Sequence, residues 1–301
     1  MRPTTTRIVS LLPSATEIVA ALGLADCLVG ISHECDYPDE IRDRPRVTRC
    51  EIHASDLPSP AIDAWVRDTL ASCGTLYTLD EELIRELRPD MILTQQLCDV
   101  CAVNYGSVAA YAATLPVPPR VINLQPARLA DIFEDIRLVA RACGVPERAD
   151  SLIAQLQQRV ESVASLVARV LSRPKCFLME WVDPPYCGGH WNPELVELAG
   201  GVDPIGRMGQ ASRRVTWEEI SRADPDVVVL ACCGLPVDRT RREMSLLAGR
   251  MEWESLRAVQ QDRVFVLDGN AYFSRPGPRV VDSLEMLAQI VTIRSPTPST
   301  R

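Results

Sequence analysis

The sequence lacks the features of membrane-spanning, exported and nucleic-acid-binding chains. No apolar run approaches the roughly 20 residues that a membrane helix needs, and the longest, Val227 to Cys233, is closed by Gly234. The polar N-terminus shows no signal peptide, which favours the cytoplasm, whereas a leader trimmed from the chain would imply a periplasmic or other extracytoplasmic place. The 301 residues carry a formal net charge of −8. We therefore expect neither insertion into a membrane nor a nucleic acid partner.

The sequence also lacks the usual signatures of catalysis. It has no nucleophile elbow, P-loop or glycine-rich dinucleotide motif, so we predict no enzyme activity and no catalytic residue. Eleven cysteines are present, several within apolar runs, as expected of free thiols in a reducing compartment. Cys98 and Cys101 form a CxxC pair that suits a metal, a redox pair or two ordinary thiols. A metal-dependent or thiol-based enzyme built on these cysteines with His33 and His190 is the rival hypothesis.

Short apolar strands alternate with helical patterns at both ends of the chain. This alternation predicts an α/β fold with parallel sheets covered on both faces. The candidate strands are Arg7–Leu12, Cys27–Ile31, Met91–Thr94 and Val121–Asn123 in the first part, and Cys176–Trp181, Val227–Ala231 and Val264–Leu267 in the last.

The middle of the chain shows a helical pattern instead of alternating strands and helices. Apolar residues recur at helical spacing from Leu129 to Cys143, and a second apolar stripe continues from Pro146 to Ser172. A helix over the second stretch would be about 40 Å long at 1.5 Å per residue, which suits a rod between two lobes. We predict an N-terminal lobe (1–125), a helical segment with the bridging helix (126–173) and a C-terminal lobe (174–301).

Two sequence echoes support paired lobes. A strand leads into the helix start at Ser14 in the first lobe and at Asn192 in the second, where Ser14 and Glu17 have capping-box spacing and Pro193 follows Asn192. The stretches 82–93 and 218–229 both run from an acidic helix start through Pro-Asp to a buried strand.

The opening of the chain resembles a known family. Arg7-Ile8-Val9-Ser10-Leu11-Leu12-Pro13-Ser14-Ala15-Thr16-Glu17, followed by Leu22-Gly23, Val29-Gly30-Ile31-Ser32 and Asp36-Tyr37-Pro38, is similar to the start of helical-backbone (class III) ABC-type substrate-binding proteins. Leu87–Leu93 and Leu198–Val202 extend the likeness, which covers about residues 7 to 290. Within this family the chain looks most similar to the cobalamin-binding branch.

The resemblance implies two Rossmann-like lobes joined by a single long α-helix, with a ligand cleft between them. It implies binding of cobalamin or a related corrinoid, as carrier, sensor or importer component. Haem or a ferric chelate is the alternative ligand. A sheet of this kind binds its ligand beyond the carboxyl ends of the strands, so loops at those ends are the candidate site.

Residues of both lobes are predicted to contact the ligand. His33 follows the second strand, and its imidazole could ligate a chelated metal or simply bond within its loop. His190 lies in a glycine-containing loop among tryptophans and tyrosines, whose flat faces suit a macrocycle; His33 and His190 are also candidate metal ligands. The predicted contact set is Pro13, Ser14, Ala15, His33, Glu34 and Tyr77 in the first lobe, and Trp181, Tyr186, His190, Trp191, Ser212, Tyr272, Phe273 and Arg275 in the second. The bland alternative for each is ordinary loop packing.

Two glutamates stand apart from this set. Glu82 and Glu218 resemble the paired glutamates with which transport members of the family dock onto an ABC importer permease. The alternative is an acidic residue favoured by the dipole of its helix N-terminus.

Overall fold

The computed structural model describes residues 6–50, 52, 57–96, 103–168 and 172–292. The chain forms two compact units. Unit 1 comprises Met1–Leu57, Ala61–Pro126 and Ala130–Gln155, and unit 2 comprises Pro58–Pro60, Ala127–Leu129 and Leu156–Arg301. Each unit is an α/β layer structure, so the predicted two-lobed α/β fold is confirmed. Within the described residues no helix has the length and apolar character needed to cross a membrane. The domain limits given from the sequence stay a prediction.

Unit 1 is built on a parallel sheet with the order β2-β1-β5-β6. Its core comes from strands buried on both faces, as in other covered parallel sheets. Val9 and Ile92 pack with Ile84 of α3 and Val108 of α4 on one face. The strands are β1 (Ile8–Ser10), β2 (Leu28–Ile31), β5 (Met91–Gln95) and β6 (Arg120–Leu124), with a separate antiparallel pair β3 (Thr48–Cys50) and β4 (Tyr77–Leu79). The helices are α1 (Pro13–Ala21), α2 (Ser59–Cys73), α3 (Glu81–Leu87), α4 (Tyr105–Ala113) and α5 (Leu129–Ala142), together with the first part of α6 (Pro146–Val167) up to Gln155.

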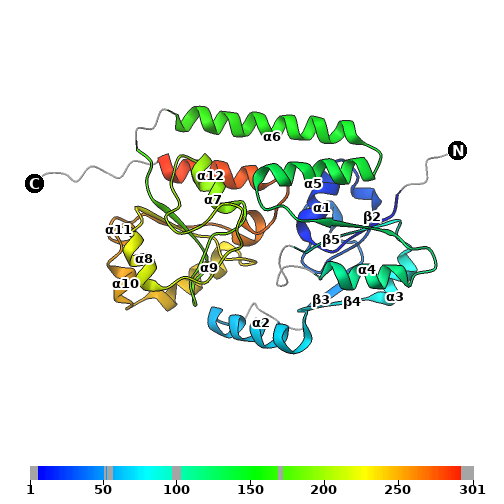
Figure 1. The fold of residues 1–301 in the computed structure, drawn as a ribbon, viewed down its shortest axis with the longest axis horizontal. Helices are drawn as coiled ribbons and strands as arrows, with labels where there is room; N and C mark the ends of the chain where they lie inside the picture. The colour runs from blue at the N-terminus through cyan, green and yellow to red at the C-terminus, as the bar shows by residue number, and fades with distance from the viewer. Residues whose placement is uncertain (1–5, 51, 53–56, 97–102, 169–171, 293–301) are drawn as a thin grey trace, which may run out of the picture. The chain divides into compact units, whose positions relative to one another are not determined.

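Unit 2 repeats this plan with the order β10-β9-β7-β8. Phe177 and Val228 pack with Ile220 of α8 and Trp253 of α10 on one face of the sheet, and α7 and α12 lie together on the other (Figure 1). The strands are β7 (Cys176–Trp181), β8 (Tyr186–Cys187), β9 (Val227–Leu230) and β10 (Val264–Val266). The helices are α7 (Asn192–Leu198), α8 (Trp217–Ala223), α9 (Val237–Glu243), α10 (Met251–Glu254), α11 (Arg257–Gln260) and α12 (Val280–Thr292).

The two sheets correspond in three of their four strands. β1 pairs in parallel with β5, and β7 pairs in parallel with β9 in the same way. The helices before β5 and β9 also match, since each ends with a left-handed residue, Arg88 (φ 44°) or Asp224 (φ 42°). The sequence echo of 82–93 and 218–229 is therefore confirmed. One strand differs, because β8 runs antiparallel to β7 whereas β2 runs parallel to β1.

Two local expectations need correction. The capping box of Ser14 and Glu17 is wrong: α1 begins at Pro13, so Ser14 lies inside its first turn, and Leu12 is the N-cap without a side-chain bond. Proline favours the first helical turn because its φ is already helical and its missing N–H is not needed there. The long helix ends at Val167, not at Ser172; its 22 residues make it about 33 Å long. Its residues up to Gln155 belong to unit 1, and those from Leu156 onward to unit 2.

Candidate functional site

In unit 1, His33 lies in the loop after β2 and is fixed by hydrogen bonds to Thr48 of β3. Thr48 Oγ1 accepts a hydrogen bond from the backbone N–H of His33 at 3.0 Å and lies 2.7 Å from Nδ1 of its ring. The ring of Tyr77 lies 5.4 Å from the imidazole, centroid to centroid. Burial, aided by the charge of Arg46, lowers the pKa of His33. The imidazole is therefore neutral at pH 7, the form in which it binds metals.

The start of α1 lies at the carboxyl end of β1. Pro13, Ser14 and Ala15 form the first turn of this helix, whose leading N–H groups have no partner inside the helix. Ser14 and Ala15 are buried and Pro13 is partly exposed. Glu34, after β2, is exposed. The backbone N–H groups of Ser14 and Ala15 can donate to an anionic or amide group of a ligand, whereas the Glu34 carboxylate can only accept.

In unit 2 the loop of His190 runs beside the loop of Ser212. His190 has the left-handed φ of 51°, a strained conformation outside glycine. Backbone bonds hold it there: its N–H donates to Gln210 O at 2.5 Å, and its carbonyl accepts from Gly209 N at 2.9 Å. A Cβ at Gly189 would lie 2.1 Å from the Ser212 nitrogen. Only glycine allows this approach of the two backbones. Burial lowers the pKa of His190, so this imidazole too is neutral at pH 7.

The predicted aromatic residues of unit 2 differ in exposure. Trp191 is 5% exposed and stacks on His190 with centroids 5.7 Å apart, and Phe273 is 1% exposed. Trp181, Tyr186, Ser212 and Tyr272 are partly exposed, whereas Arg275 is buried and donates to Asn270 Oδ1 at 3.0 Å. Ser212 lies between α7 and α8, whereas the others lie in β8 or in segments at strand ends. Their contact with a ligand stays a prediction.

Several buried polar atoms in this part of unit 2 have no hydrogen-bond partner among the described residues. They are Nε1 of Trp181, Nε1 of Trp191 and Oδ1 of Asn192. Buried donors and acceptors are normally satisfied, by water or a ligand where protein does not serve. These atoms are covered by protein, so an ordered water is the partner that would satisfy them.

Glu180, near the end of β7, is a residue that the sequence analysis did not single out. Its Oε1 accepts from Gly189 N at 3.0 Å and from Asn192 Nδ2 at 2.7 Å. Ser212 bonds to the same carboxyl group, and burial raises its pKa to about 7. A sequence signal existed, because Glu180 is the one acidic residue in an otherwise apolar strand.

The two proposed docking glutamates occupy equivalent positions. Glu82 is the second residue of α3 and Glu218 the second of α8, and both are exposed. Asp80 and Thr216 cap the two helices with side-chain bonds to backbone N–H groups. Glu218 pairs with Arg222 at 2.8 Å on the surface.

The four proposed metal ligands do not all lie within one described unit. Cys98 and Cys101 lie outside the described residues, and His33 and His190 belong to different units. Across the described parts of the chain there is no cluster of three or more His, Cys, Asp or Glu side chains suited to an ion. The metal assignment stays a prediction.

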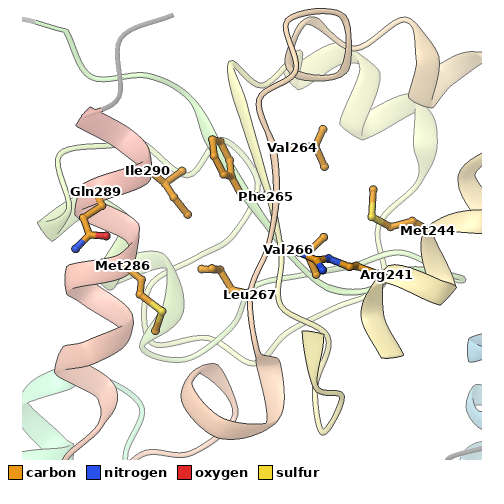
Figure 2. Close-up of a pocket in the computed structure, with 9 residues that line it drawn as sticks. All are labelled: Arg241, Met244, Val264, Phe265, Val266, Leu267, Met286, Gln289 and Ile290. Atoms are coloured by element: carbon orange, nitrogen blue, oxygen red, sulfur yellow. The ribbon is translucent and has the colours of Figure 1, made fainter. Parts of the chain in front are cut away.

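A separate open hollow lies beside the edge strand of unit 2. Figure 2 shows side chains of α12 on one side of the strand and Met244 with Arg241 on the other. Its volume of about 620 Å³ is within the range of ligand pockets. The lining residues are Arg241, Met244, Val264, Phe265, Val266, Leu267, Met286, Gln289 and Ile290, none of them in the predicted contact set.

Sequence comparison gives the class of protein to which this fold belongs. The chain belongs to the periplasmic binding protein family, which matches residues 8–271. This confirms the resemblance to class III substrate-binding proteins. The family consists of binding proteins rather than enzymes.

Three individual proteins are similar to this chain over most of its length. A vitamin B12-binding protein of Vibrio cholerae is 25% identical over 294 residues, covering 95% of this chain and 89% of the relative. An uncharacterized ABC transporter substrate-binding lipoprotein of Bacillus subtilis is 22% identical, covering 95% and 79%. The apo periplasmic heme-binding protein of Roseiflexus has the same fold, with a TM-score of 0.70 at 22% identity, covering 95% of this chain and 97% of that one.

Proposed function

We propose that the chain binds cobalamin or a related corrinoid without chemically changing it, as a carrier, sensor or importer component. The observation that carries the proposal is the likeness to a vitamin B12-binding protein along 95% of the chain. The ligand loops are those at the carboxyl ends of the strands, where α/β sheets bind ligands. The predicted location between the lobes stays part of this proposal.

The chemistry of the strand-end loops suits a corrinoid. Corrinoids present a broad apolar ring with amide side chains and a central cobalt. Partly exposed Trp181, Tyr186 and Tyr272 offer apolar surface. His33 and His190 are neutral, as an imidazole ligand to cobalt must be.

The side hollow of Figure 2 is a poorer candidate. It runs along β10, whose residues line it from Val264 to Leu267. It contains no histidine and none of the loops that follow β7 or β9. We therefore assign ligand binding to the strand-end loops.

Calorimetric titration with cyanocobalamin tests this function. We expect one corrinoid per chain and a weaker affinity for His190→Ala, with Met244→Ala in the side hollow as the matched control that binds normally. If the folded chain gives no heat of binding at saturating cyanocobalamin, the proposal that it binds a corrinoid is refuted.

Haem or a ferric chelate is the second candidate ligand. The Roseiflexus protein with this fold is named for heme binding, and two neutral histidines also suit haem iron. Titration with haem and with a ferric hydroxamate distinguishes these ligands from a corrinoid. A tighter affinity for either than for cyanocobalamin would replace the corrinoid in the proposal.

An ABC importer permease is the proposed macromolecular partner. Glu82 and Glu218 would dock onto its basic residues, since they are exposed at matching positions of equivalent helices. Their equivalence favours a paired role over two unrelated helix-dipole effects.

A further inference from the structure

The carboxyl group of Glu180 joins three segments of unit 2. It bonds to Gly189 in the His190 loop, to Asn192 at the start of α7 and to Ser212 in the neighbouring loop. Its backbone carbonyl also accepts from Cys233 N, after β9, at 2.9 Å. One side chain thus connects the His190 loop with the Ser212 loop, and both loops carry residues of the predicted contact set.

The two oxygens of the Glu180 carboxyl group differ in their hydrogen-bond partners. Oε1 accepts from two groups, the Gly189 amide and the Asn192 side-chain amide. Neither of these nitrogens can accept a proton or a hydrogen bond. The Ser212 hydroxyl can either donate or accept. A proton taken up by the carboxyl group is therefore best placed on Oε2, with the hydroxyl of Ser212 as its acceptor.

We propose that Glu180 is a positioning residue for the ligand site: its carboxylate holds the His190 loop against the Ser212 loop, and uptake of one proton weakens this hold. The proposal deepens the proposed function and rests on it for the ligand. Hydrogen bonds to a charged acceptor are roughly twice as strong as those to a neutral one. The neutral acid therefore fixes the left-handed His190 less firmly, and the ligand binds the ionised form better.

The surroundings set the pH at which this occurs. Burial raises the pKa of Glu180 to about 7, opposed by its hydrogen bonds. The charged group that faces it is Asp203, which is partly exposed and whose pKa desolvation raises to about 6. Cys187 and Cys232 face the same region, and burial raises the pKa of both thiols, so they are neutral there. Among the described residues no cation contributes to the shift of Glu180.

Cyanocobalamin titrations at pH 8 and pH 6 test the proposal. A site competent only with ionised Glu180 loses up to about tenfold in affinity between these values, because only about one chain in ten is ionised at pH 6. Glu180→Gln should bind with the weaker affinity at both pH values. Asp203→Asn is the matched control: it removes the other neutral-range carboxyl and should keep the pH dependence. Wild-type pH dependence in Glu180→Gln, or its loss in Asp203→Asn, would overturn the proposal.

A second measurement needs only the wild-type chain. At pH 7, binding should release about half a proton per ligand, seen by calorimetry in buffers of different ionisation enthalpy. No proton release would also overturn the proposal.

A third measurement separates this proposal from the function on which it rests. In the ligand-free chain, hydrogen exchange of the segment 188–192, corrected for intrinsic rates, should be slower at pH 8 than at pH 6. Glu180→Gln should remove this difference. If no corrinoid binds at pH 8, the proposed function is refuted, but the exchange experiment still tests the role of Glu180. Equal protection of segment 188–192 at pH 6 and pH 8 would refute that role.

Discussion

Substituting Gly189 should disrupt the contact between the two loops of unit 2. An alanine Cβ would lie 2.1 Å from Ser212 N, 2.6 Å from Ser212 Cα and 2.8 Å from the carbonyl carbon of Ala211. All three are backbone atoms, which cannot rotate away as a side chain can. The backbones must separate by more than 1 Å to reach ordinary contact, at a cost at the upper end of overpacking, about 3 kcal/mol. Gly189→Ala should therefore unfold at a urea concentration roughly 1 M lower than the wild type.

Gly188→Ala is the matched control for this experiment. Its Cβ would meet Cδ2 of Leu178 at 3.2 Å, the end of a flexible side chain. We expect a loss below about 1 kcal/mol. Chemical denaturation monitored by circular dichroism measures both variants, and corrinoid titration of the folded proteins shows whether the displaced His190 loop also weakens binding. Equal urea midpoints for Gly189→Ala and the wild type would refute the steric argument.

Three further predictions concern other parts of the chain. Burial raises the pKa of Asp135 to about 7, so the stability that this residue contributes is present below about pH 4 and lost as the pH rises to about 7. Asp135→Asn should therefore match the wild type at pH 4 and exceed it by about 2 kcal/mol at pH 8, measured by urea unfolding; an equal difference at both pH values would contradict this. Arg159 donates two hydrogen bonds of 2.8 and 2.7 Å to Glu285. Arg159→Met should lower the free energy of unfolding by about 1 kcal/mol, measured by thermal unfolding, and Arg137→Met, which breaks a more exposed ion pair, should lower it by less. The double variant Glu82→Lys/Glu218→Lys should bind cyanocobalamin as the wild type does but fail to deliver it to membrane vesicles that contain the importer; normal delivery would refute the docking role.

Seven of the ten described strands could be predicted because their signal is local, whereas the short antiparallel strands β3, β4 and β8 were not predicted. β7 has the predicted bounds, and the other six predicted strands are present with ends moved by one or two residues. Continuous apolar runs closed by turn residues are enough to locate buried parallel strands. Helix ends were less well defined: at α1 the choice between Pro13 and Ser14 depended on which residue best fits a first turn.

The site was only partly predictable from the sequence. Histidines, aromatic residues and glycines in strand-end loops stand out in any reading of the chain, and the fold places them after the predicted strands. The partners of Glu180 lie 9, 12 and 32 residues away along the chain, in two loops and at the start of α7. No local pattern encodes such a convergence. Sequence can mark Glu180 as an acid in an apolar strand, but only packing shows which backbone groups it holds.

A crystal structure of the chain grown with hydroxocobalamin would test the central claim most directly. The corrin ring should contact strand-end loops, with His190 and its aromatic neighbours within van der Waals distance of the ligand. Density for the corrin in the hollow of Met244 and Met286, or a chain that crystallises without the ligand at saturating concentration, would contradict the assigned site.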